Sequence, residues 1–163
     1  MAEAQLEAFG ARLAEHEGRL HVAASLAEAQ RRACELIGDA TVAAWEDDVL
    51  AGVAAQPAAA AQDAEVSLVA ADAGVVQTGQ IALVHHSGRA RATDLLPERQ
   101  IALLEASAVC PSLSEALARL FADGVPGNVV LVAGPSRTAD IEQRSIRGVH
   151  SPRELDVIVY SAQ

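Results

Sequence analysis

The fold is decided by the stretch IALLEASAVCPSLSEALARLF, residues 101–121, in which an apolar run is followed by a helix signal. The run Ile101–Leu104 is short, wholly apolar and typical of a strand buried in a sheet. Ser112 and Glu115 form the S-x-x-E pattern of a capping box, which predicts a helix over residues 113–121. A buried strand that leads into a capped helix indicates an α/β protein.

The same two signals alternate along the rest of the chain. Compact apolar runs predict further strands at Arg19–Ala23, Thr41–Trp45, Val66–Ala70, Gln80–His85, Val129–Ala133 and Leu155–Tyr160. Periodic patterns predict helices over residues 2–17, over Leu26–Ile37 after a Ser25/Glu28 capping box, and over Asp47–Ala55, with a loop at Gln56–Asp63. Strands that alternate with helices predict one domain over residues 1–163, with a mostly parallel sheet flanked by helices.

Charge and composition exclude several classes of function. The 163 residues carry a formal charge of −10, and only 2% are aromatic. A nucleic-acid partner needs a basic face and usually aromatic stacking platforms, so none is expected. All 12 basic residues are arginine, which excludes Schiff-base chemistry and a Walker lysine. Arginine is suited to fork-shaped recognition of a carboxylate or a phosphate, and 8 of the 12 lie in residues 82–163.

Cysteine usage and hydropathy indicate where the chain works. Cys34 and Cys110 share no metal-ligand spacing, so we expect no structural zinc and no iron–sulfur cluster on this chain. The sequence has no apolar run of about 18 residues, so no membrane span is predicted. We therefore expect a soluble, cytoplasmic protein with reduced thiols.

Side chains that could hold a ligand are densest in the stretch VVLVAGPSRTADIE, residues 129–142. A buried strand is expected to lead into a Gly-Pro turn and then a helix start, and ligands of open α/β sheets bind beyond the carboxyl ends of strands. Four residues there are candidates to bind a carboxylate or a phosphate: Gly134, Ser136, Arg137 and Thr138. The alternative is an ordinary helix cap, in which Asp140 and Glu142 complement the helix dipole and would repel an anion.

Two other segments offer contacts to a ligand. The loop Gly74–Gln80 contains Thr78 and Gly79, which are candidate contacts, with an ordinary turn between strands as the favoured alternative. Arg89 and Arg91 are two residues apart and would face the same side, which suits an anion, although a solvated loop also explains them.

His150 is the candidate catalytic residue, because a histidine in a turn bracketed by Gly148 and Pro152 can carry a proton near neutral pH. A triad of Ser136, Asp140 and His150 is rejected, since the chain lacks the G-x-S-x-G nucleophile elbow.

These segments together resemble the LUD-domain family, which includes the LutC/YkgG-type lactate utilisation proteins. The resemblance lies in the run Gly134–Glu142, followed by Gly148-Val149-His150 and Pro152. Upstream, Gln77-Thr78-Gly79 and Leu95-Leu96-Pro97 occur in the family's order and spacing. The similarity covers roughly residues 66–160, and the first 60 residues are similar only in general layout.

The resemblance implies a NagB/RpiA/CoA-transferase-like fold and a component of an L-lactate oxidation system that yields pyruvate. It implies iron–sulfur clusters on separate partner proteins, and the two cysteines fit a component with no cofactor of its own. The ligand expected from the residues themselves is a small carboxylate or phosphate. Where the family commonly carries glutamate this chain has Gln77, and a neutral amide is no general base, so whether the subunit is an enzyme stays open. Two alternatives are a stand-alone enzyme or binding protein for a phosphorylated or CoA-linked molecule, and a docking protein that uses its acidic N-terminal half. The oligomeric state, a homo-oligomer included, stays open too.

Overall fold

A six-stranded parallel sheet forms the centre of the molecule. The computed structural model describes residues 3–135, 137–138, 146–147 and 152–161. The strand order is β1-β12-β7-β4-β2-β3, and every neighbouring pair is parallel. Its strands are β1 (Arg19–Ala23), β2 (Thr41–Ala44), β3 (Gln56–Pro57), β4 (Val66–Ala71), β7 (Arg99–Glu105) and β12 (Glu154–Tyr160). The predicted α/β class with a largely parallel sheet is confirmed.

The three central strands β4, β7 and β12 are buried on both faces, which explains why their sequences read as continuous apolar runs. The register pairs Leu68 with Ile101 and Ile101 with Asp156. Most of the large buried side chains of the hydrophobic core come from these strands.

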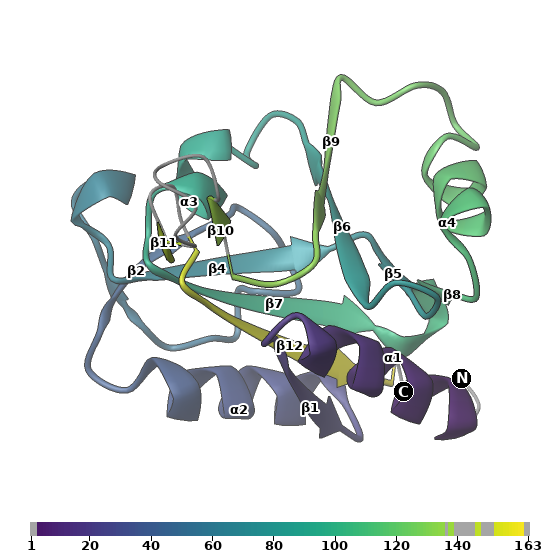
Figure 1. Cartoon of the computed structure of the whole chain (residues 1–163). Coiled ribbons are helices and arrows are strands. Elements are labelled where there is room, and N and C mark those ends of the chain that lie inside the picture. The colour runs from purple at the N-terminus through teal and green to yellow at the C-terminus, as the bar shows by residue number, and fades with distance from the viewer. Residues whose placement is uncertain (1–2, 136, 139–145, 148–151, 162–163) are drawn as a thin grey trace.

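Helices and a second sheet cover the two faces of the central sheet (Figure 1). Helix α2 (Leu26–Ile37) packs against β12 and β1. Helix α1 (Glu3–Glu15) lies beside β1, and α3 (Arg91–Leu95) packs on β4 on the side away from α2. Helix α4 (Leu113–Leu120) packs on the second sheet, and two short 3-10 turns, η1 (Ala61–Asp63) and η2 (Ala106–Ala108), join strands.

The second sheet has four strands in the order β8-β5-β6-β9 and mixed directions. Strands β5 (Ala73–Val75) and β6 (Gln80–His85) form a hairpin, β8 (Val109–Cys110) is parallel to β5, and β9 (Asn128–Val132) is antiparallel to β6. The strand expected at Val129–Ala133 therefore exists, but it is not a buried strand of the parallel sheet. It pairs with the free edge of the hairpin, and its residues are only half-buried or exposed.

Two capped helices were placed correctly by the sequence, and one expected helix was not. The Glu28 N–H donates to Ser25 Oγ at 3.3 Å at the start of α2, and the Glu115 N–H does the same to Ser112 Oγ at the start of α4. The expected helix at Asp47–Ala55 is instead a run of turns. Asp47 Oδ1 accepts the Val49 N–H at 2.9 Å, which closes a local turn in competition with helix hydrogen bonds.

Candidate functional site

Two glycines bring two of the predicted ligand-contact segments against helix α1. Gly79 has φ +68°, and a side chain there would collide with the backbone of Arg12 and Leu13. A side chain at Gly134 would collide with the carbonyl of His16, one turn further along. The close approach that these glycines permit is therefore an approach to the C-terminal end of α1.

The register of β6 and β9 explains why these segments meet. Ile81 pairs with Val132 in an antiparallel ladder, so the residues before β6 and after β9 lie at the same end of the second sheet. Thr78 and Gly79 belong to the turn between β5 and β6, where the Thr78 hydroxyl donates to Gln80 Oε1 at 2.9 Å. The structure thus brings Thr78, Gly79 and Gly134 together.

The remaining predicted contacts are only partly described. Ser136, His150 and residues 139–145 lie outside the described residues. The backbone of Arg137 and Thr138 forms strand β10 (Arg137–Thr138), antiparallel to β11 (Ile146–Arg147). Arg137 and Thr138 are therefore paired in a short strand ladder, and the helix start expected after them, with Asp140 and Glu142, lies outside the described residues.

Arg91 and Arg89 have different surroundings, although they were expected to face the same side. Arg91 is exposed and begins α3, beyond the end of β6 that is remote from Thr78. Arg89 turns inward and is held by two carboxylates: Nη2 lies 2.5 Å from Asp47 Oδ2, and Nη1 lies 2.7 Å from Asp72 Oδ1. Burial disfavours its charge, but the hydrogen bonds to both aspartates prevail and raise the pKa of Arg89. Its positive charge is already paired, so Arg89 offers no anion site.

Trp45 and His85 extend the cluster around Arg89. The guanidinium lies 5.1 Å from the Trp45 ring centre, and the His85 ring meets the indole edge-on at 5.4 Å. His85 Nε2 lies 3.0 Å from Asp94 Oδ1, while Nδ1 lies 2.9 Å from Asn128 Oδ1. We call Asp47, Asp72, Arg89, Trp45, His85 and Asp94 the Arg89 cluster.

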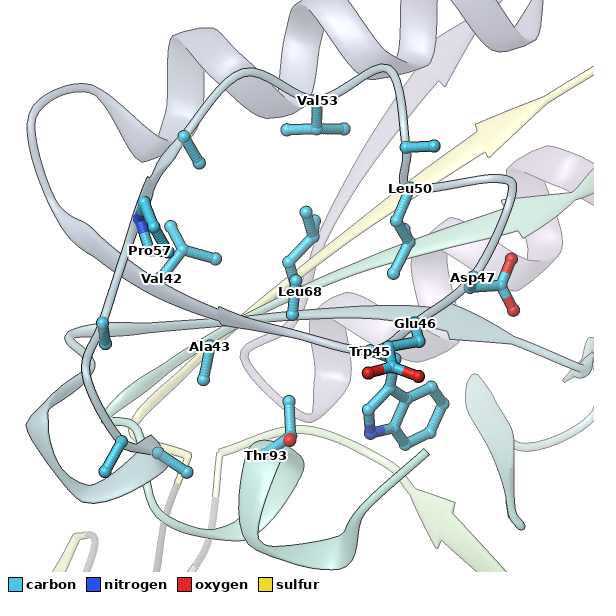
Figure 2. A pocket seen from close by; sticks show the side chains of 16 residues that line it. Val42, Ala43, Trp45, Glu46, Asp47, Leu50, Val53, Pro57, Leu68 and Thr93 are labelled. Atoms are coloured by element: carbon cyan, nitrogen blue, oxygen red, sulfur yellow. The ribbon is translucent and has the colours of Figure 1, made fainter. Parts of the chain in front are cut away.

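A pocket of about 560 Å³ opens beside this cluster, at the carboxyl end of β2 (Figure 2). Its walls are largely apolar, with Leu50, Val53 and Leu68 among the lining residues, and Trp45, Glu46 and Asp47 lie together at one side of the opening. The charged lining groups are carboxylates, so this pocket does not suit a small anion.

The Arg89 cluster was missed by the sequence analysis, although a signal for part of it was present. Asp47 and Asp72 follow the carboxyl ends of the neighbouring parallel strands β2 and β4, and such positions meet at one edge of a sheet. The partner that joins them, Arg89, lies 42 and 17 residues away in the sequence, and no local pattern indicates that pairing.

Metal-ligating groups and thiols can be described for most of the chain. Within residues 3–135 and 152–161, no group of three or more His, Cys, Asp or Glu side chains is arranged to hold a metal ion. Cys34 is half-buried on α2, and burial raises the pKa of the Cys110 thiol. None of the described helices is long and apolar enough to cross a membrane.

Comparison with known proteins identifies relatives of the larger part of the chain. A family model, that of the LUD domain, matches residues 56–160, which extends the resemblance noted above to residue 56. A lactate utilization protein C of an Exiguobacterium species is 34% identical over 101 residues, which are 59% of this chain and 44% of that protein. The protein of the same name from Bacillus pumilus is 36% identical over 97 residues, 56% of this chain and 40% of the relative. The uncharacterized protein YkgG of Escherichia coli is 32% identical over 97 residues, 56% of this chain and 42% of the relative.

The chain thus spans less than half of the length of these curated relatives. Its full extent is matched by a crystal structure of a DUF162 family protein from Deinococcus radiodurans. The TM-score is 0.71, the sequence identity is 23%, and 98% of this chain and 99% of that chain are covered. This likeness shows the fold.

Proposed function

Because the chain belongs to the LUD-domain family, we propose that it is the LUD-domain component of a system that oxidises L-lactate to pyruvate. The observation that carries the proposal is the family match over residues 56–160, together with relatives named lactate utilization protein C. That match includes Gln77-Thr78-Gly79 and the Gly134–Glu142 run. The parallel sheet with a smaller second sheet supports a NagB/RpiA/CoA-transferase-like architecture, which we include in the proposal.

In this system the chain would bind a small carboxylate through the segment that follows β9. The Arg137 guanidinium would bind the carboxylate, with Ser136 and Thr138 as hydroxyl donors. The position of Thr78, Gly79 and Gly134 at one end of the second sheet supports a common site for both segments.

Oxidation of the lactate hydroxyl to a ketone releases two electrons and two protons. We propose that His150 takes up the proton of the hydroxyl, that the second proton is released to water, and that separate iron–sulfur partner proteins accept the two electrons. As part of such a system the chain would work in the cytoplasm, where Cys34 and Cys110 stay reduced.

Calorimetric titration of the purified chain with L-lactate and with pyruvate tests the carboxylate site. A charge-assisted hydrogen bond contributes about 1.5–3 kcal/mol, so Arg137→Ala should weaken binding about tenfold or more. The matched control is Arg31→Ala on α2, a side chain that is 69% exposed. Unchanged affinity in Arg137→Ala would refute the assignment. Binding of CoA or a sugar phosphate in place of either carboxylate would favour the alternative of a protein that acts on phosphorylated or CoA-linked molecules.

A further inference from the structure

A second, smaller pocket of about 200 Å³ lies between α3, the start of β7 and the end of β9. It is separate from the pocket at β2, and its lining includes Asp94, Gln100, Leu131, Gly134 and Pro152. At about 30 Å³ for each water-sized group, it has room for roughly six or seven such groups. This is the size of a very small organic molecule.

Two neighbouring buried side-chain oxygens, one of them on the lining residue Gln100, have no hydrogen-bond partner in the part of the chain that the structure describes. Gln100 is 1% exposed, and its Oε1 accepts no hydrogen bond. Ser67 is the register partner of Gln100 on β4, is fully buried, and its Oγ is unpartnered as well. Buried polar groups in native proteins are nearly always satisfied, and an exception indicates a missing partner, which can be a water, an ion or the polar group of a ligand. Two adjacent exceptions on one face of the sheet strengthen that indication.

A second polar group of the pocket is the Asp94 carboxylate, which is 2% exposed. His85, also buried, lies 3.0 Å from Asp94 Oδ1 and holds the carboxylate in place. Asp94, held by His85, and Gln100 therefore supply oxygen acceptors to a pocket whose lining also includes the apolar Leu95, Val130 and Val132. A carboxylate has further lone pairs besides the one used by His85.

We infer that this pocket binds the hydroxyl end of a small hydroxylated ligand, with Gln100 Oε1 as the acceptor of its O–H and the Asp94 carboxylate beside it. For L-lactate as the ligand, the inference rests on the function proposed above. The lactate hydroxyl would enter the pocket, while its carboxylate would stay outside the pocket. A carboxylate inside the pocket would be repelled by Asp94, so the two ends of the ligand are sorted by charge.

This arrangement distinguishes a hydroxyl from a carbonyl. A hydroxyl donates its one hydrogen bond to Gln100 Oε1, whereas the keto oxygen of pyruvate would face this acceptor with lone pairs and leave it unpaired. Sites built to hydrogen-bond a substrate O–H reject the analogue that lacks it. Gln100 would thus favour the reduced member of a hydroxy-acid/keto-acid pair.

The test compares L-lactate and pyruvate binding to the wild-type chain, Gln100→Met and Gln56→Met by calorimetry. Methionine keeps the length of the side chain and removes the unpartnered amide oxygen, so Gln100→Met should fold with unchanged or higher thermal stability. Gln56 is exposed on β3 and supplies the same substitution as a control. We expect the wild type and Gln56→Met to bind lactate about tenfold tighter than pyruvate. Gln100→Met should lose this preference through weaker lactate binding, with pyruvate affinity unchanged. A preference that survives in Gln100→Met would overturn the inference.

A second measurement separates this inference from the proposed function. 1,2-Propanediol carries the hydroxyl and methyl of lactate without a carboxylate, and acetone carries only the carbonyl. In spectra of ¹⁵N-labelled protein, the side-chain amide signals absent from Gln100→Met belong to Gln100. These Gln100 signals should shift when the diol is added and should not shift when acetone is added. Diol-dependent shifts without lactate binding would support the pocket and refute the proposed function. Lactate binding without those shifts, and with an unchanged preference in Gln100→Met, would refute the pocket alone. Failure of both experiments would refute both.

Discussion

Gly79 shows how a single residue can determine the position of a whole segment. Its φ of +68° lies in the left-handed region, and its missing side chain leaves room for the backbone of α1 at Arg12 and Leu13. Any other residue would be strained at this φ and would also collide with that backbone. The turn between β5 and β6 therefore depends on this glycine to stay close to α1.

We expect Gly79→Ala to lower the free energy of unfolding by about 1–3 kcal/mol, because the backbone conformation and the contact with α1 both become strained. Urea denaturation followed by circular dichroism measures the loss. Gly127→Ala is the control, since Gly127 has ordinary φ and no atom within 4 Å of an added Cβ. Equal stability of Gly79→Ala and the wild type would show that α1 does not pack on this turn.

The ion pairs between β1 and β12 hold an edge strand in place. Arg19 Nε donates to Asp156 Oδ1 at 2.8 Å, and His21 Nε2 lies 2.8 Å from the same oxygen. Asp156 is fully buried, whereas the Arg19 side chain is 52% exposed. Burial disfavours the Asp156 carboxylate, but its hydrogen bonds to Arg19 and His21 prevail, so the pKa of Asp156 is lowered.

This lowered pKa predicts how the free energy of unfolding declines at acid pH. A carboxyl group whose pKa is lower in the folded chain stabilises it at pH values above the unfolded pKa, about 3.9, and that stability is lost as the pH falls below it. Asp156→Asn should therefore reduce the free energy of unfolding at pH 7 by about 2 kcal/mol and flatten its decline between pH 5 and 3. Thermal unfolding over this pH range measures both effects. Asp123→Asn, at an exposed position, should change neither. If the free energy of unfolding declined as steeply between pH 5 and 3 in Asp156→Asn as in the wild type, Asp156 would not be the group responsible.

Elements with a local signal could be predicted from the sequence, and elements defined by their partners could not. Helix α2 and strand β1 were predicted with their observed bounds, because a capping box and a compact apolar run are local patterns. Strands β5 and β8 have three and two residues, too few for a period to be visible. The run at Val129–Ala133 was recognised as a strand, but its sheet was not, because the choice of partner depends on the hairpin edge.

The same distinction holds for the candidate site. Thr78, Gly79 and Gly134 were found from turn chemistry and from the family resemblance. The pairing of Gln100 with Ser67 and the contact of His85 with Asp94 depend on tertiary packing, so only the fold reveals them.

At the scale of the whole molecule, the two sheets share one hydrophobic core. Ile81 and Leu83 of β6 belong to the same buried cluster as the central strands β4, β7 and β12. A smaller cluster, which includes Val75, Cys110 and Ala116, lies under α4. We propose that residues 1–163 form one domain that unfolds in a single cooperative step, because opening either sheet exposes the core of both.

Trp45, the only tryptophan of the chain, reports on the junction of the sheets. It follows β2 of the central sheet, is 3% exposed, and contacts His85 of β6 in the second sheet. We expect the urea transition of Trp45 fluorescence to coincide with that of far-ultraviolet circular dichroism, which is dominated by α1, α2 and α4. Trp45→Met should remove the fluorescence change and leave a single circular dichroism transition at a lower urea concentration. If the fluorescence transition came first, the contact between the sheets would open while the helices persist, and the chain would consist of two separately folding units.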